Sequence, residues 1–144
     1  MLSDDAKIAI AREYYRRSDA GSPDLLDLFT EDAEIYFPKY GVGPARTAFA
    51  EAVAGLLTRL KSLVHPMTGY RYFPSGNALI VEGTTNGEAL DGRTWTGGET
   101  PGGRFCSVLE FRGELISRMY IYLDPDYLSD NEEDFLWGRD GRRW

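Results

Sequence analysis

The sequence predicts one α+β domain, with helices first and a run of strands after them. Apolar residues recur at helical spacing up to about residue 61, and from there on they alternate with polar ones. Short clusters of Gly, Pro and Asn separate the alternating runs, as is typical of antiparallel strands. Helices and strands segregated in this way indicate helices packed on one face of a bent sheet. A length of 144 residues is enough for one domain with a core and an internal pocket.

Three helices are expected before residue 61. Ser3 is a suitable N-cap for the first, because a serine hydroxyl can accept a hydrogen bond from the first turn. Ser22-Pro23 is typical of the start of a short second helix, and Pro44 predicts the start of a third. Between the second and third helices, residues 33–37 are expected to be extended and residues 41–43 to form a loop.

Five strands are expected after the third helix, at residues 62–73, 78–86, 92–98, 104–112 and 115–123. Successive side chains of a strand point to opposite faces, so one alternate set of each strand should face the helices. In three of the strands these inward sets are Leu79, Val81, Gly83 and Thr85; Phe105, Ser107, Leu109 and Phe111; and Leu115, Ser117, Met119, Ile121 and Leu123. The inner surface would then be apolar and aromatic, with hydroxyl groups but without a carboxylate from these strands.

The charge balance is acidic, with 16 Lys and Arg against 23 Asp and Glu and a formal net charge of −7. The acidic residues concentrate between Asp124 and Asp134, where no basic residue occurs. This balance argues against nucleic acid as a partner, because nucleic acid requires a basic face. A solvated tail is the expected form of this acidic segment. Aromatic residues near the end of the chain, Phe135-Leu136-Trp137 and Trp144, suggest that part of it docks on the body.

Several classes of site are not expected. The single cysteine, Cys106, cannot form an internal disulfide, and one histidine without a cysteine cluster argues against a metal site. The glycine-rich stretches lack the lysine and the strand-to-helix context of a phosphate loop, so nucleotide binding is not expected. No apolar run approaches the roughly 18 residues of a membrane span. The first residues are acidic where a secretory signal is basic, so a cytoplasmic location is expected.

Four sets of residues occur in a characteristic order: Gly21 with Leu25-Leu26-Asp27-Leu28-Phe29-Thr30-Glu31-Asp32-Ala33, Gly43 before the third helix, Thr100-Pro101-Gly102-Gly103-Arg104, and Glu110-Phe111-Arg112-Gly113 running to Tyr122-Leu123-Asp124-Pro125. Together they resemble the SnoaL-like branch of the nuclear transport factor 2-like superfamily. The resemblance implies a cone-shaped fold, a cystatin-like α+β barrel. In it a curved antiparallel or mixed sheet wraps around three N-terminal helices and encloses an apolar pocket. Residues 1–127 would form the SnoaL-like domain, and residues 128–144 an acidic and aromatic C-terminal extension of the same domain.

The resemblance also implies a homodimer through the outer face of the sheet. Arg118, Tyr120 and Tyr122 lie at alternate positions that would suit this face. Aromatic residues and arginine are favoured at protein interfaces.

Membership of this superfamily does not by itself define a function, because the fold hosts isomerases, cyclases, dehydratases, epoxide hydrolases and binding proteins. Ketosteroid isomerases pair a tyrosine of the first helix with two carboxylates. Here Tyr14 lies near the tyrosine position, but Phe37 and Ser107 stand at the carboxylate positions. Limonene epoxide hydrolases use three ionic residues, and the matching positions of this chain are uncharged, namely Gly83, Thr85 and Ile121. The last of these also replaces the acid of many polyketide cyclases in the family, so all three mechanisms are disfavoured.

One candidate acid/base residue remains. His65 is the only histidine and follows the third helix. It resembles the catalytic histidine of scytalone dehydratase-like and dehydrochlorinase-like members, which an acid on the first helix orients. Glu13 lies near that acid position, with Tyr14 next to it. A neutral imidazole can take a proton from carbon or oxygen near neutral pH. A purely structural histidine, in the core or at the surface, is the competing interpretation.

The sequence therefore predicts a cofactor-independent enzyme that isomerises, cyclises or dehydrates a small hydrophobic molecule in an enclosed pocket. His65 would be the acid/base group, with Tyr14 or Glu13 as its orienting group or a second proton donor. The pocket would be shaped by Phe37, Phe49, Trp95, Phe105, Ser107, Met119 and Ile121. A non-catalytic small-molecule-binding protein of the same fold is the alternative.

Overall fold

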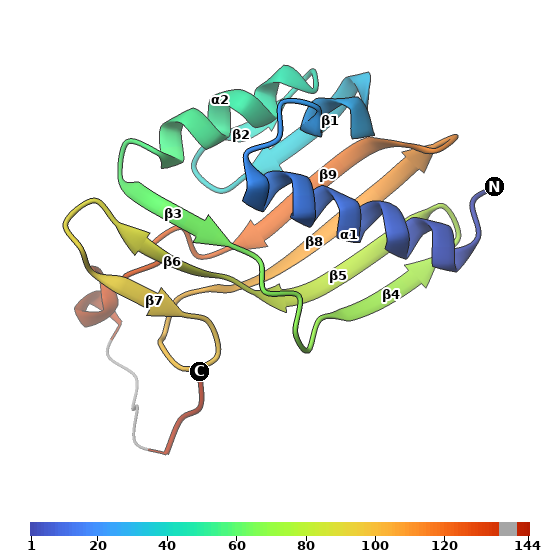
Figure 1. Ribbon diagram of the computed structural model, residues 1–144. Helices are drawn as coiled ribbons and strands as arrows, with labels where there is room; N and C mark the ends of the chain where they lie inside the picture. The colour runs from blue at the N-terminus through green and yellow to red at the C-terminus, as the bar shows by residue number, and fades with distance from the viewer. Residues whose placement is uncertain (136–140) are drawn as a thin grey trace.

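The computed structural model describes residues 1–135 and 141–144 of the chain (Figure 1). Its helical elements are α1 (Asp4–Ala20), the 3-10 helix η1 (Leu25–Leu28), α2 (Thr47–Leu56) and the 3-10 helix η2 (Glu132–Asp134). The strands are β1 (Phe29–Phe37), β2 (Gly41–Gly43), β3 (Leu60–Val64), β4 (Arg71–Ser75), β5 (Ala78–Thr84), β6 (Asn86–Ala89), β7 (Thr94–Thr96), β8 (Arg104–Arg112) and β9 (Leu115–Leu123).

The strands form two sheets. The larger sheet has the order β2-β1-β9-β8-β5-β4, and the smaller one has the order β3-β6-β7. β1 and β9 run parallel, while the other paired strands are antiparallel. Figure 1 shows α1 and α2 over one side of the curved larger sheet, with the smaller sheet beside one of its ends. This arrangement confirms the α+β fold class and the curved mixed sheet.

Both ends of α1 follow from the local sequence. The Ser3 hydroxyl accepts a hydrogen bond of 3.1 Å from the Ala6 N–H, as expected for an N-cap. Gly21 adopts a left-handed conformation with φ 61°, and its N–H donates to the last turn of the helix. Tyr14 and Tyr15 are buried on the face that packs over the sheet.

The second and third expected helices are shorter than the sequence suggested. The second is the four-residue turn η1, because Phe29 already belongs to β1, where it is 1% exposed and pairs with Ile116 of β9. The third, α2, begins at Thr47 rather than Pro44. Leu60, inside the stretch where helical spacing was expected, starts β3 instead and is buried with Trp95 and Tyr127.

The long strand expected at 62–73 is two strands in different sheets. Pro66 has no N–H to donate, and Met67 and Gly69 adopt left-handed φ values of 59° and 73°, so the chain turns between β3 and β4. The strand expected at 78–86 ends at Thr84, and β6 begins at Asn86. The expected loop at 41–43 is the short strand β2, which pairs with β1.

The inward-facing sets are confirmed for β8 and corrected for β9. In β8, Phe105, Ser107, Leu109 and Phe111 are all buried. In β9 the register shifts near Ile116, which is fully buried, whereas Leu115 is 38% exposed and Ser117 half-buried. Such an irregularity moves the side chains on one side of it to the opposite face. Beyond the shift, Met119 and Ile121 point inward as expected.

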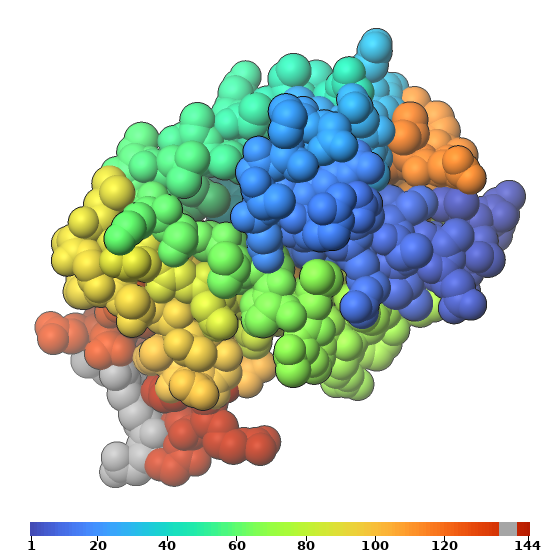
Figure 2. Space-filling model, viewed as in Figure 1, coloured from blue at the N-terminus to red at the C-terminus, as the bar shows by residue number. Residues whose placement is uncertain are grey.

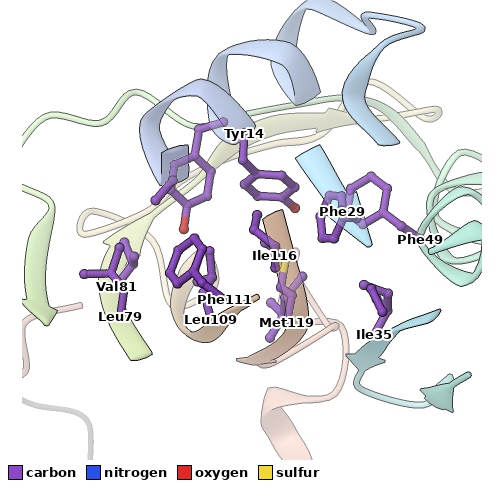
Figure 3. Close-up of a cluster of buried hydrophobic side chains, with 14 of the residues drawn as sticks. Tyr14, Phe29, Ile35, Phe49, Leu79, Val81, Leu109, Phe111, Ile116 and Met119 are labelled. Atoms are coloured by element: carbon purple, nitrogen blue, oxygen red, sulfur yellow. The ribbon is translucent and has the colours of Figure 1, made fainter. Parts of the chain in front are cut away.

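The core fills the space between α1 and the larger sheet. Figure 3 shows Tyr14 extending from α1 toward Ile116 and Met119, with Phe29 and Phe49 beside it. The Tyr14 ring centroid lies 5.9 Å from that of Phe29 and 5.7 Å from that of Phe49, both edge to face. None of the helices in the described part of the chain is long and apolar enough to cross a membrane.

The segment after β9 folds back against the smaller sheet. Tyr127 stacks on Trp95 with ring centroids 4.7 Å apart, and the Asp130 carboxylate pairs with the Arg93 guanidinium. The Trp144 carbonyl accepts a hydrogen bond from the arginine that begins β8. Leu136 and Trp137 of the expected aromatic tail lie outside the described residues.

Candidate active site

A cavity of about 350 Å³ lies beside the packed core, enclosed by α1, α2, β3 and strands of the larger sheet. Its wall is mostly apolar, with leucine, valine and aromatic side chains from these elements. Leu57 and Val64, at the ends of α2 and β3, line the cavity and are 56% and 41% exposed, so they mark its opening. Figure 2 presents this face of the molecule, where α1, α2 and β3 meet.

Five of the seven side chains expected to shape the pocket line this cavity: Phe37, Phe49, Phe105, Ser107 and Ile121. They lie there because strand alternation directs them inward from β1, β8 and β9, and because Phe49 lies on the buried face of α2. Ser107 and Ile121 are register partners across β8 and β9, so they form one continuous patch of the wall.

Trp95 and Met119 do not line the cavity. Trp95 is 2% exposed and lies behind Tyr127 and Thr85, where its Nε1–H donates to the Thr85 hydroxyl at 3.1 Å. Met119 is fully buried in the packed core, paired in register with Ile35. Both side chains were expected to point inward and to reach the pocket. Both are buried, but other side chains pack around them and separate them from the cavity.

His65 lies directly after β3 and at the edge of the cavity. Its Nδ1 is 2.7 Å from Asp19 Oδ1, and its backbone N–H donates to Asp19 Oδ2, also at 2.7 Å. The His65 and Asp19 side chains are 12% and 23% exposed, so water screens the pair only in part. With Nδ1–H donated to Asp19, Nε2 keeps the lone pair of the neutral ring.

Glu13, the acid expected to orient His65, lies elsewhere. Its carboxylate binds Arg16 Nη2 at 2.5 Å and Arg17 Nε at 2.8 Å, and it does not line the cavity. Hydrogen bonds from these guanidinium groups lower the pKa of Glu13 from 4.5 to about 2. The structure therefore replaces Glu13 by Asp19 as the acid that contacts His65.

Tyr14 lines the cavity, as expected, at the boundary with the packed core. It is 3% exposed, and burial raises the pKa of its phenol well above the ordinary value of 10. The hydroxyl therefore stays protonated and can donate a hydrogen bond at any physiological pH. No side chain or carbonyl in the described part of the chain accepts one from it.

Three residues of the site were missed in the sequence: Asp19, Tyr15 and Tyr127. The spacing of Tyr15 and Asp19 is a signal that could have found them, because residues four apart share one helix face. The Tyr15 ring lies 4.8 Å from the His65 ring, so both residues of this face contact the histidine. Tyr127 carries no comparable signal, since only the return of the chain after β9 brings it to the cavity.

A second, more open hollow of about 610 Å³ shares Phe37, Leu56 and Tyr127 with the cavity. Its lining is strongly ionic and includes Arg93 and Asp130, which pair with each other. The enclosed cavity is the better candidate site because it holds His65 and Asp19, whereas the open hollow holds no histidine. Within residues 1–135 and 141–144, no group of three or more His, Cys, Asp or Glu side chains is placed to hold a metal ion.

Comparison with solved structures places the fold among nuclear transport factor 2-like proteins. One of unknown function from Burkholderia pseudomallei matches with a TM-score of 0.72 and 17% identity, over 88% of this chain and 95% of that one. TerC, co-crystallised with polyporic acid, matches with a TM-score of 0.69 and 21% identity, over 83% and 92%. A protein of Xanthomonas campestris pv. campestris, provisionally named a polyketide cyclase, matches with a TM-score of 0.66 and 16% identity, over 85% and 93%.

Identities this low define the fold alone. Residues 11–119 match the model of the SnoaL-like domain, and the chain belongs to this family. Among the structural neighbours, the Xanthomonas protein carries a provisional cyclase name and one from Bacillus subtilis a provisional isomerase name. No curated protein matches the sequence.

Proposed function

We propose that this protein is a cofactor-independent enzyme that isomerises, cyclises or dehydrates a small hydrophobic molecule in the 350 Å³ cavity by acid/base chemistry. The observation that carries the proposal is the pair of His65 and Asp19 at the edge of an otherwise largely apolar wall. Histidine is the side chain whose ordinary pKa is best matched to proton transfer near neutral pH.

In this mechanism His65 Nε2 takes a proton from the bound molecule and later returns it to another atom of the same molecule. Asp19 holds the ring in the Nδ1–H tautomer and stabilises the imidazolium that forms. Tyr14 donates a hydrogen bond to an oxygen on which negative charge develops. The aromatic wall excludes water and holds one productive conformer.

A proton-transfer assay tests this role without knowledge of the natural substrate. 2-Tetralone is a small bicyclic ketone with acidic C–H groups, and its deuterium uptake in D₂O is measured by NMR. We expect the wild-type protein to accelerate exchange above the buffer rate. His65→Gln and Asp19→Asn should each lower the protein-catalysed exchange rate about hundredfold or more. Glu13→Gln is the matched control, because Glu13 is an acid of the same helix that lies outside the cavity.

A non-catalytic binding protein is the second candidate function. The observation that favours it is the scarcity of ionisable groups in the wall, whose charged side chains are Asp19 and Lys61 together with the titratable His65. The same assay separates the two functions. If 2-tetralone binds and its exchange rate equals that in buffer, the protein is a binder and the acid/base proposal is rejected.

We also propose that two copies associate through the outer face of the larger sheet. The Tyr36 ring centroid lies 5.5 Å from those of Tyr120 and Tyr122, and the last is 48% exposed. The Arg118 guanidinium lies over the Tyr120 ring at 3.5 Å and pairs with Glu110. This face combines aromatic groups with both signs of charge, so a second copy can pair with it despite the net charge of −7.

A further inference from the structure

The enclosed cavity and the open hollow are separated by a shared wall. Five of the described residues line both the 350 Å³ cavity and the 610 Å³ hollow: Phe37, Ala52, Leu56, Leu60 and Tyr127. A side chain that lines two hollows lies between them, so these five residues form a partition. Leu57 and Val64, which mark the opening of the cavity, do not line the open hollow, so the partition is distinct from that opening.

Tyr127 is the largest of the partition residues and comes from a different part of the chain. The other four belong to β1, α2 and β3. Tyr127 lies in residues 124–131, here called the return segment, which follows β9. It is 4% exposed although it borders two hollows, so its ring fills the space between them.

Two contacts hold Tyr127 in this position. Its ring stacks on the buried Trp95 ring, with centroids 4.7 Å apart and an interplanar angle of 25°. Its backbone lies so close to Gly102 that a Cβ atom on that glycine would be 2.1 Å from the Tyr127 carbonyl oxygen. The tyrosine must break both contacts to swing aside, so the partition is a fixed part of the fold.

Acidic residues give the return segment its shape. The Asp124 carboxylate accepts a hydrogen bond of 2.9 Å from the Asp126 N–H. The Asp126 carboxylate accepts from the N–H groups of Asp130 and Asn131, both at 2.9 Å. Asp130 also pairs with Arg93, next to β7. Carboxylates that bind nearby backbone N–H groups stabilise a turn, so three acids of the run at 124–134 hold the return segment in shape.

We infer that Tyr127 is a specificity-determining residue, which closes the cavity toward the open hollow and thereby limits the length of the molecule that binds. The favoured ligand is then a compact apolar molecule, such as one with fused rings, rather than a long-chain one. A ligand enters and leaves past Leu57 and Val64. This inference rests on the proposed ligand cavity but not on acid/base chemistry, because it concerns the length of the bound molecule and no bond is made or broken.

Chain length is a direct measure of how deep the cavity is. Each methylene group that is buried on binding tightens it about threefold, whereas a methylene group that stays in water adds nothing. The affinity of a linear series therefore rises with chain length until the cavity is full, and then levels off. A structural change that weakens all ligands equally does not move the length at which this happens.

The linear methyl ketones from 2-pentanone to 2-tridecanone provide such a series, with dissociation constants measured by NMR titration of the full-length protein. We expect the affinity of wild type to level off within the series. In Tyr127→Ala it should level off about two or more methylene groups later, because loss of the ring leaves a void that joins the two hollows. Leu56→Ala thins the partition from the side of α2 and should shift the length in the same direction. It keeps the stack on Trp95, so it serves as the test if Tyr127→Ala does not fold.

Leu90→Ala is the matched control. Leu90 lines the open hollow but not the cavity and is 62% exposed, so its removal leaves the partition intact. The levelling-off length should equal that of wild type. The place of the bound chain gives a second readout. Intermolecular NOEs between 2-tridecanone and the methyl groups of Leu128, which lines the open hollow but not the cavity, should be absent in wild type and present in Tyr127→Ala.

An unchanged levelling-off length in both partition variants, or NOEs to Leu128 in wild type, would overturn the inference and leave the proposed acid/base function standing. An affinity that rises through the whole series in wild type would overturn it as well. Failure of every ketone to bind would overturn the inference together with the proposed ligand cavity. Loss of deuterium exchange in His65→Gln with an unchanged levelling-off length would support both, so the two proposals fail separately.

Discussion

Asp19 holds His65 at two points, with Oδ1 2.7 Å from the ring Nδ1 and Oδ2 accepting at 2.7 Å from the backbone N–H. The last turn of α1 is thereby tied to the residue that follows β3. Both elements border the opening of the cavity, so one carboxylate orients the candidate base and also fixes the edge of the site. The backbone contact helps to fix His65 in place, although the residue lies outside a strand.

The tautomer of His65 is the first prediction. Because Asp19 accepts at Nδ1, the neutral ring should carry its proton on Nδ1 rather than on Nε2. Long-range ¹⁵N–¹H NMR of a tag-free protein reports this without ambiguity, since the chain has one histidine. In Asp19→Asn the spectrum should shift toward a mixture of tautomers, whereas Glu13→Gln should leave it unchanged. A predominant Nε2–H tautomer in wild type would contradict the role given to Asp19.

The ion pairs of Glu13 should make the stability of the folded state depend on pH, in a direction that the pKa of Glu13 defines. Its folded-state pKa of about 2 lies below the ordinary 4.5 because of the hydrogen bonds from Arg16 and Arg17. The ionised form therefore favours the folded state, so its contribution is fully present above about pH 4.5 and is lost as the pH falls toward 2. The difference in urea midpoint between wild type and Glu13→Gln should shrink across this window.

The Glu13 effect should be small and weakened by salt, because its side chain is 33% exposed and water screens its ion pairs. Glu114→Gln is the control, since Glu114 is exposed and forms no ion pair among the described residues. A difference between wild type and Glu13→Gln that is constant from pH 6 to pH 2 would show that the ion pairs do not contribute in solution.

Trp95 should contribute stability rather than ligand contacts. Trp95→Phe removes the hydrogen bond to Thr85 and part of the stack on Tyr127, and it leaves a void in a buried site. We expect a loss of about 2 kcal/mol in the free energy of unfolding, measured by urea denaturation. The affinity for 2-tetralone should change less than twofold once the fold is intact. A large loss of affinity without destabilisation would place Trp95 in the cavity wall after all.

The proposed homodimer is tested on its most exposed tyrosine. Tyr122→Glu places an unpaired charge in the middle of the aromatic face and should convert the dimer to monomer in sedimentation equilibrium. Leu90→Glu is the matched control, because Leu90 is 62% exposed but lies next to the smaller sheet. A wild-type protein that sediments as a monomer at all concentrations would refute the dimer.

The long strands β8 and β9 were predicted from sequence with both ends correct, at 104–112 and 115–123. Their alternation is local, and Gly113 marks the turn between them with a left-handed φ of 61°. The break at Pro66 was harder to predict, because β3 and β4 are separated by the sheet to which each strand pairs, and this pairing is with segments distant in sequence.

The candidate site was predictable in its apolar part and less so in its polar part. Phe105, Ser107 and Ile121 line the cavity because strand alternation is encoded locally, although the register shift in β9 moved Leu115 and Ser117 away from the expected face. Spacing alone could not show whether Glu13 or Asp19 contacts His65. Arginines one turn further along α1 neutralise Glu13, while Asp19 faces a histidine 46 residues away.

The sequence by itself determined the fold class, the family, the single histidine and the apolar character of the inner strand faces, because hydrophobic periodicity and turn residues act over short distances. Only the tertiary structure decided which acid meets His65, which hydroxyl groups face the cavity, and that Trp95 and Met119 are packed behind its wall. These outcomes depend on how far β3 runs before it turns and on where the chain returns after β9. Both are set by packing between segments that are distant in sequence.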